Sequence, residues 1–258
     1  PQDIAALASI GRSRVSARCR IRVGLLSTGD ELLRPQENPD SSPLRPGALF
    51  DANHYLLASL LETYPASVTD LGICGDRREA LQQALAQAGS GQDVILTSGG
   101  ASHGEEDHLV AALDALGEVE ILDLAIKPGR RLVLGRIGSC DVIGLPGNPV
   151  AAMISFLLYA RPLLLRRAGA AVSPPHRLMV ASGFSLPSRK AGRREFLRAR
   201  LVAGPDGTLT ADLYARSGSG LISSLRAADG LVELAEDVAE VAPGTPVPFL
   251  SFAAFGVV

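Results

Sequence analysis

The hydrophobic and polar positions of the chain follow two alternating patterns up to about residue 170. Short continuous apolar runs, typical of buried parallel strands, alternate with stretches whose apolar residues recur at helical spacing. The runs predict strands at 21–26, 67–73, 93–97, 119–126, 131–137 and 141–144. The periodic stretches predict a helix opened by Asp51 and further helices at 77–88, 105–116 and 149–167. This order favours an α/β fold, a parallel-type sheet with helices on both faces.

The pattern changes after Ser173-Pro174-Pro175. Short β-rich segments follow, separated by Gly, Pro, Asp and Ser, at 177–184, 195–202, 208–213, 230–234 and 245–250. No helix is evident among them, so we expect a small all-β barrel or sandwich. The predicted division is an N-terminal remnant at 1–17, an α/β domain at 18–172 and a small β-barrel domain at 173–258.

The first residues resemble the tail of a helix, with apolar positions at Ile4, Leu7 and Ile10. We therefore expect 1–17 to be the remnant of a helix or linker that begins upstream. No basic segment precedes an apolar stretch at the start, as it would in a secretory signal. The apolar run at 150–160 is too short to span a bilayer.

Composition narrows the class of protein. The chain has 258 residues, of which 47% are hydrophobic and 20% charged, so it can build a core. A formal net charge of -2 argues against a sequence-wide role in binding nucleic acid or a membrane surface. The three cysteines, Cys19, Cys74 and Cys140, form no CxxC pair and fit a reducing compartment, so we expect a cytoplasmic location.

Glycine-rich and acidic loops follow several of the predicted strands, at 27–31, 72–76, 98–107 and 144–149. Because the carboxyl ends of parallel strands open on one edge of a sheet, we expect these loops to meet in one crevice. Glycines let backbone amides approach an anion, and carboxylates bind Mg²⁺ together with substrate phosphates. The sequence therefore predicts a phosphate-and-metal site.

Each loop also has a structural interpretation that the sequence leaves open. Ser98-Gly99-Gly100 fits a phosphate cradle or a plain strand-to-helix turn. The loop at 144–149 fits a rigid ligand-binding loop or a helix cap. The turn at 127–131 fits an oxyanion clamp or a solvated hairpin turn. Asp30, Glu31, Asp76 and Asp107 are better cation ligands than Glu105 and Glu106, which also suit a first helical turn.

Other polar residues carry weaker signals. His103 and His108 lie five positions apart, on different faces of a helix, so a shared metal is not expected. A basic run in the second domain fits either a solvated strand and loop or an anion contact across a subunit interface. It comprises Arg189, Lys190, Arg193, Arg194, Arg198 and Arg200.

In order and spacing, the motifs resemble those of the molybdopterin molybdenumtransferases of the MoeA/gephyrin family. They are Ser27-Thr-Gly-Asp-Glu-Leu32, Asp51-Ala-Asn53, Asp70-Leu-Gly-Ile73 with Asp76, Ser98-Gly-Gly-Ala-Ser-His-Gly-Glu-Glu-Asp107, Ala125-Ile-Lys-Pro-Gly129 and Gly144-Leu-Pro-Gly-Asn-Pro149. Gly192-Arg-Arg-Glu-Phe196 and Ser217-Gly-Ser-Gly-Leu221 extend the resemblance more weakly. It implies a pterin-binding α/β domain followed by a small β-barrel. It also implies an enzyme that inserts molybdate into adenylylated molybdopterin, releases AMP, uses a divalent cation such as Mg²⁺ and works as a homodimer.

The resemblance implies specific site residues. The family's acidic site positions fall on Glu31, Asp76 and Asp107, which are the expected catalytic and metal-binding residues. Its two loop prolines fall on Pro146 and Pro149, and its lysine falls on Lys127. With the loops above, the predicted substrate-binding residues are Thr28, Gly29, Asp30, Ser98, Gly99, Gly100, Ser102, Lys127, Arg130, Pro146, Gly147, Asn148 and Pro149.

The chain departs from the family pattern in places. Ala101 and His103 replace usual valines, His108 a common aromatic residue and Asp123 a frequent basic one. The resemblance implies two further N-terminal domains, nearly all of which we expect to lie outside this sequence, so the chain alone is expected to bind ligand rather than complete turnover. The alternative is a non-catalytic pterin- or nucleotide-binding module related to molybdopterin adenylyltransferase or competence-associated proteins. A gephyrin-like scaffold has no support beyond this kinship.

Overall fold

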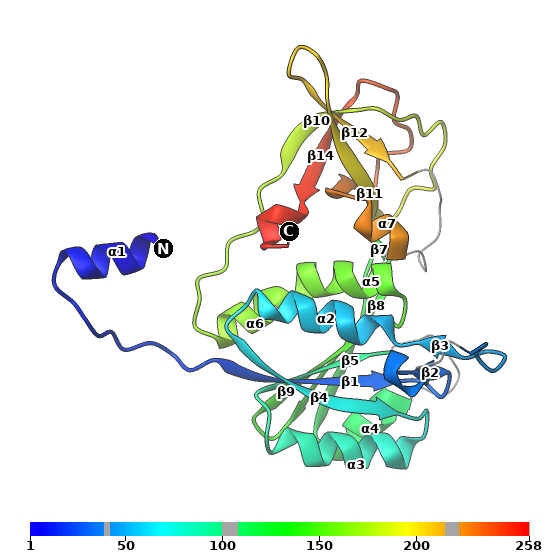
Figure 1. Cartoon of the computed structure of the whole chain (residues 1–258). Helices are drawn as coiled ribbons and strands as arrows, with labels where there is room; N and C mark the ends of the chain where they lie inside the picture. Colours follow the sequence, from blue (N-terminus) through cyan, green and yellow to red (C-terminus); the bar gives the residue numbers. More distant parts are fainter. Residues whose placement is uncertain (39–41, 100–107, 215–221, 258) are drawn as a thin grey trace.

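Two six-stranded sheets organise the chain, whose computed structural model describes residues 1–38, 42–99, 108–214 and 222–257 (Figure 1). In the first sheet the strand order is β4-β1-β5-β9-β8-β6. The parallel strands are β1 (Ile21–Thr28), β4 (Ala66–Cys74), β5 (Val94–Ser98) and β9 (Cys140–Leu145). Two antiparallel strands, β8 (Arg131–Ile137) and β6 (Glu118–Asp123), extend one edge. The predicted parallel sheet is thus confirmed, with an antiparallel extension.

Helices cover both faces of this sheet, as predicted. One face carries α2 (Ala52–Glu62) and a long helix made of α5 (Pro149–Ser155), the π-helical η2 (Phe156–Ala160) and α6 (Arg161–Arg167). The other face carries α3 (Arg78–Gly89) and α4 (His108–Leu116). In β5, Val94 and Leu96 pack into the cluster beneath α2 and α5, whereas Ile95 packs against α3 and α4. Side chains alternate between the two faces of β5, so this strand, which is apolar throughout, contributes to the hydrophobic core on each side of the sheet.

One helix among the described residues, Pro149–Arg167, is long and apolar enough by length and composition to cross a membrane. Burial in the protein core explains this apolar composition, because Ile154, Phe156 and Leu157 lie in the largest core cluster. The helix begins at Asn148, whose side-chain oxygen accepts hydrogen bonds from the Val150 and Ala151 amides. We interpret it as a core helix.

The second sheet is a closed barrel, as predicted, and lies over the face of the first sheet that carries α2, α5 and α6 (Figure 1). The barrel strands are β10 (Leu178–Ser182), β11 (Arg194–Ala203), β12 (Leu209–Leu213), β13 (Gly230–Leu234) and β14 (Pro246–Ser251), and the sixth strand of the sheet, β7 (Ile126–Lys127), pairs with β11. Pairing of β12 with both β10 and β11 closes the barrel. A small cluster that includes Val232 and Phe249 fills the interior.

Two sequence-based predictions about elements were wrong. No helix was expected after residue 173, but α7 (Ile222–Arg226) and the 3-10 helix η3 (Phe252–Phe255) lie there. Both are too short to show helical periodicity. The strand predicted at 119–126 ends at Asp123, and its last apolar residue belongs to β7 (Ile126–Lys127), which pairs with β11 in the other sheet.

The N-terminal segment forms helix α1 (Gln2–Ser9), which stands away from both sheets (Figure 1). None of its residues is buried. The expected helical character of the first residues is therefore present, and the core of the molecule is built from the residues that follow.

Candidate functional site

A cleft of about 610 Å³ opens at the carboxyl ends of the parallel strands β1, β5 and β9. Many of the predicted site residues line it, namely Thr28, Glu31, Asp76, Ser98, Gly99, Pro146, Gly147, Asn148 and Pro149. Post-strand loops distant in sequence therefore do meet in one place, as parallel-sheet topology requires.

The floor and the rim of the cleft differ in chemistry. Thr28 and Ser98 are buried at the floor, where the Thr28 hydroxyl donates to the Ser98 carbonyl over 3.4 Å. Gly99 has a φ of +94°, and a Cβ there would lie 2.5 Å from the Thr28 carbonyl oxygen. Glu31 and Asp76 are exposed at the rim. Hydroxyls and close backbone below exposed carboxylates suit an anion held together with a cation.

Gly29 and Asp30 do not line the cleft but shape its rim. Gly29 has a φ of +147°, and its amide donates to the Cys74 carbonyl over 3.1 Å. An Asp30 carboxylate oxygen accepts a hydrogen bond from the Asp76 amide over 3.2 Å. These contacts join the loop after β1 to the loop after β4, so Asp30 positions Asp76 instead of facing the cleft.

Several predicted residues lie outside the described part of the chain. They are Gly100, Ser102 and Asp107, together with Ala101, His103, Glu105, Glu106 and the motif at 217–221. Among the residues that the structure describes, no group of three or more His, Cys, Asp or Glu side chains gathers as a metal site. The cation site of Glu31, Asp76 and Asp107 therefore stays a prediction.

Lys127 and Arg130 do not line the cleft. The Lys127 ammonium group pairs with the Glu195 carboxylate on β11 over 3.0 Å. The turn after Lys127 thus follows a strand of the second sheet, not a hairpin within the first one. A role for Lys127 and Arg130 in anion binding stays a prediction.

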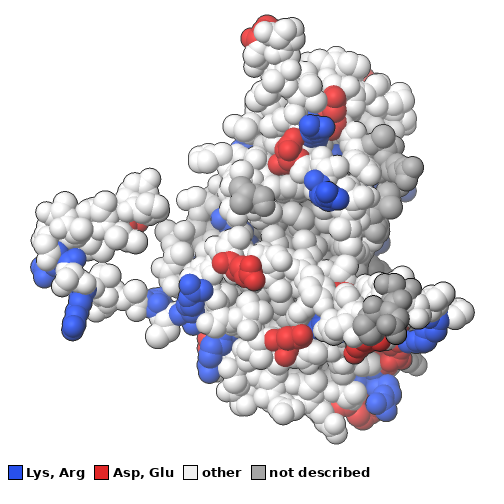
Figure 2. Space-filling view, viewed as in Figure 1, with Lys and Arg blue, Asp and Glu red and all other residues white. Residues whose placement is uncertain are grey.

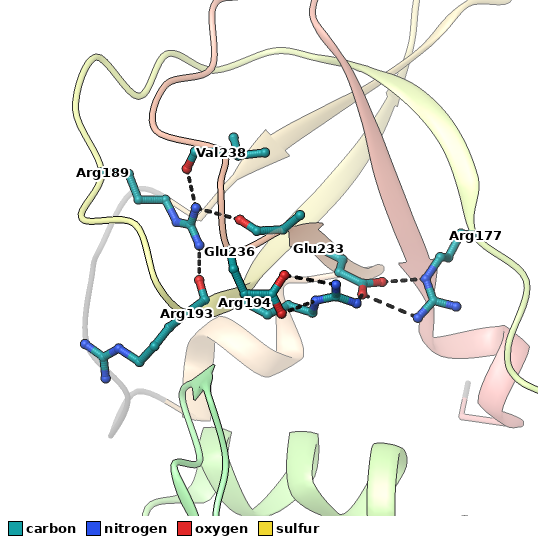
Figure 3. A network of polar contacts seen from close by, with 8 residues as sticks. Arg177, Arg189, Arg193, Arg194, Glu233, Glu236 and Val238 are labelled. Carbon is teal, nitrogen blue, oxygen red and sulfur yellow. Dashed lines mark hydrogen bonds and ion pairs between the residues drawn. The ribbon is translucent and has the colours of Figure 1, made fainter.

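Arginines of the basic run form hydrogen bonds and ion pairs within the barrel domain (Figure 3). The Arg194 guanidinium lies between Glu233 at 2.8 Å and Glu236 at 3.1 Å, and Arg177 holds the other Glu233 oxygen at 2.6 Å. The hydrogen bond with Glu236 raises the pKa of Arg194, and the same contact lowers the pKa of Glu236. Arg189 donates to the backbone carbonyls of Ala235, Val238 and Arg193. These contacts account for Arg189 and Arg194 without a bound anion.

Part of the cleft wall was not predicted. It comes from Leu32, Leu49, Phe50, Asp51, Ala52, Asn53, Leu81 and His108. The short strands β2 (Leu32–Leu33) and β3 (Leu49–Phe50) pair with each other. Glu31 directly precedes β2, and its carbonyl accepts a hydrogen bond from the Leu49 amide over 2.8 Å. The segment that connects the two strands contains η1 (Pro35–Glu37). The motif Asp51-Ala-Asn53 was predicted as a helix start and counted among the family motifs, but none of its residues was named as a site residue.

A network of charged side chains around the buried Arg34 lies behind this wall. Arg34, only 5% exposed, contacts the carboxylates of Asp51 and Asp70, each at 2.9 Å. His54 lies beside it, with Nε2 at 3.5 Å from Asp70. Burial lowers the pKa of His54, the Arg34 charge lowers it further, and the two carboxylates act in the opposite direction.

Family models match nearly all of the chain that carries this geometry. Residues 24–166 match the model described as a probable molybdopterin binding domain, and residues 183–252 match the MoeA C-terminal region (domain IV). The chain belongs to the MoeA family of molybdopterin-binding proteins. The cleft lies within the first matched region, and the barrel corresponds to the second.

Individual relatives of the MoeA family agree with this assignment. The chain is 32% identical, over 98% of its length, to a molybdopterin molybdenumtransferase of Haemophilus influenzae. It is 33% identical, over 95% of its length, to molybdopterin molybdenumtransferase 2 of Mycobacterium tuberculosis. A molybdopterin biosynthesis MoeA protein from Pyrococcus horikoshii has a similar crystal structure, with a TM-score of 0.79 and 29% identity over 97% of this chain.

The MoeA-family relatives are longer than this chain. The chain spans 61% and 60% of the two curated relatives and 59% of the Pyrococcus protein.

Proposed function

We propose that this chain is the pterin-binding part of a molybdopterin molybdenumtransferase, which inserts molybdate into adenylylated molybdopterin and releases AMP. The observation that supports it most is the cleft of post-strand loops inside the region that matches the molybdopterin-binding model. The 32% identity to a molybdenumtransferase over nearly the whole chain supports the same reaction.

Roles for the cleft residues follow from their chemistry. The buried hydroxyls of Thr28 and Ser98 and the close backbone at Gly99 would hold the phosphate groups that join pterin and AMP. Glu31 and Asp76 would hold Mg²⁺ with Asp107, and exposed carboxylates beside a phosphate site are the donor set that Mg²⁺ takes. The cation would neutralise charge as the P–O bond to AMP breaks. Positioning and electrostatic stabilisation would supply most of the catalysis.

We further propose that the partners are small molecules and a second copy of the chain, in the cytoplasm, rather than nucleic acid or a membrane. The formal net charge of -2 argues against nucleic acid and a membrane surface as partners. Figure 2 shows basic side chains on the N-terminal segment that carries α1. Elsewhere on the face in view, acidic and basic side chains are interspersed. Interspersed charge is a poor electrostatic match for a polyanion.

A non-catalytic pterin- or nucleotide-binding module is the alternative. Its support is that the chain spans only about three fifths of the relatives named as transferases. It predicts ligand binding without molybdate-dependent AMP release, even when the rest of the protein is present.

The test is AMP release from adenylylated molybdopterin by the full-length protein, with and without molybdate. We expect molybdate to stimulate release, and Asp76→Asn to lower the rate about 100-fold by weakening the cation site. The matched control is Asp206→Asn, at an exposed acid in the turn between β11 and β12. An unchanged rate in the Asp76 variant would contradict the assignment.

A further inference from the structure

One asparagine side chain joins two walls of the cleft. Asn53 lies in the first turn of α2, and the residue is 7% exposed. Its Nδ2 group donates to the Ser98 hydroxyl over 2.7 Å and to the Gly147 carbonyl over 2.7 Å. Ser98 lies at the end of β5 and Gly147 in the loop after β9, at sequence separations of 45 and 94 residues from Asn53.

The helix that carries Asn53 is itself held firmly. Asp51 caps it by accepting from the His54 amide over 3.0 Å, and the same carboxylate pairs with Arg34 at 2.9 Å. Towards the other end of the helix, Leu60 and Leu61 are buried in the main core. Asn53 therefore projects its carboxamide from a fixed element into the gap between two loops.

The two loops approach each other closely at this point. A Cβ built on Gly147 would lie 3.5 Å from the Cα of Gly99. The Gly99 amide also donates to the Leu145 carbonyl over 3.2 Å, at the point where β5 and β9 end. Beyond that backbone contact, the Asn53 amide links Ser98 to Gly147, so its loss would release both loops together.

The bonding of Asn53 argues against a purely stabilising role. Its Oδ1 atom is buried and has no hydrogen-bond partner among the described residues. Leaving a buried acceptor unpaired lowers stability. An apolar side chain at this position would not leave a buried acceptor unpaired. Holding the two loops at a set separation, in contrast, requires only the two N–H donors of the carboxamide.

We propose that Asn53 is a positioning residue that sets the separation between the Ser98 and Gly147 loops and so the shape of the phosphate-binding floor. This inference rests on the proposed function for its effect on the reaction, although the effect on the loops is independent of it. Misplacing a binding loop by about 1 Å is enough to slow a reaction about 100-fold.

The test compares two substitutions on the same helix in the full-length protein. Asn53→Ala removes the link, and Leu57→Ala removes core packing without touching either loop. We expect Asn53→Ala to speed amide hydrogen exchange at Gly99 and Asn148 and to lower kcat for AMP release about 10- to 100-fold. Leu57→Ala should lower Tm, while loop exchange and kcat of the folded fraction stay within about twofold of the wild type.

The outcomes separate this inference from the proposed function. If Asn53→Ala lowers Tm but leaves loop exchange and kcat as in the wild type, Asn53 is only structural and the inference is overturned. If Leu57→Ala changes loop exchange and kcat as strongly, the effect is not specific to the link and the inference is likewise overturned. If the wild type shows no molybdate-dependent AMP release, the proposed function fails, and the exchange at Gly99 and Asn148 still decides the role of Asn53.

Discussion

His54, in the first turn of α2, lies among charges of both signs beside the cleft wall. Burial is the main cause of its lowered pKa, and the Arg34 guanidinium acts in the same direction. Asp70 and Asp51 oppose them, with Asp70 at 3.5 Å from Nε2. The net result is an imidazole that stays neutral in the folded protein at pH values where a solvated histidine, with a pKa of 6.5, gains a proton.

This difference predicts a pH dependence of stability. Below the unfolded-state pKa the unfolded chain binds a proton at His54 that the folded protein resists, so the free energy of unfolding falls as the pH drops. The contribution is fully present above pH 6.5 and is lost as the pH falls through the folded-state pKa. Urea unfolding between about pH 7.5 and pH 5.5 should show a steeper loss in the wild type than in His54→Gln. If the free energy of unfolding fell equally steeply with pH in the two proteins, His54 would not be the source of the pH dependence.

At the scale of elements, Arg34 holds together parts of the chain that are far apart in sequence. It follows β2, and it contacts Asp51 at the start of α2 and Asp70 on β4. The β2–β3 pair that carries Glu31 is attached to α2 through the Asp51 amide, which donates to the Leu33 carbonyl over 2.9 Å. Arg34 therefore supports the rim of the cleft through charge, although it does not line it.

Removing this charge should be costly. Arg34→Met would leave the Asp51 carboxylate buried beside an apolar side chain, and we expect a loss of about 3–5 kcal/mol in the free energy of unfolding. The matched control is Arg22→Met, whose partner Asp93 is 34% exposed and stays solvated, so this loss should destabilise the protein far less than Arg34→Met does. Chemical denaturation of the three proteins at neutral pH makes the comparison. Equal stabilities of the two variants would contradict the proposed role of Arg34 in holding β2, α2 and β4 together.

The loops that follow parallel strands could be predicted from the sequence, because buried strands have continuous apolar runs and their ends share one edge. Thr28, Glu31, Asp76, Ser98 and Gly147 were located in this way. These strands are long enough to show a continuous apolar pattern, and the loops lie directly at their ends.

The remaining parts of the site lacked such a local signal. The strands β2 and β3 have two residues each, which is too short for any periodicity. Asn53 belongs to a helix start, and only its hydrogen bonds to distant loops bring it to the cleft. Ile126 extends the apolar pattern of β6, but it pairs with Arg194 in the other sheet, a contact that sequence pattern does not encode.

On the scale of the whole molecule, the two sheets share one hydrophobic cluster. Barrel residues such as Phe196 and Leu250 belong to the same cluster as Leu57 of α2 and Phe156 of the long helix. A hydrogen bond adds to this contact, because the Tyr64 hydroxyl donates to the Phe255 carbonyl over 2.6 Å. Arg161 lies 5.6 Å from the ring centres of both Tyr64 and Phe255. The barrel is thus fixed over the helices that form one wall of the cleft.

The central claim is that this cleft binds the phosphate-bearing tail of the pterin substrate. Titration calorimetry of the full-length protein with adenylylated molybdopterin and Mg²⁺ tests it most directly, with Gly99→Ala compared with Gly207→Ala. Both glycines have positive φ, but a Cβ at Gly99 would meet the Thr28 carbonyl at 2.5 Å, whereas nothing lies within 4 Å of one at Gly207. We expect Gly207→Ala to bind as the wild type does and Gly99→Ala to bind at least about 10-fold more weakly. Equal affinities for the two variants would contradict the claim.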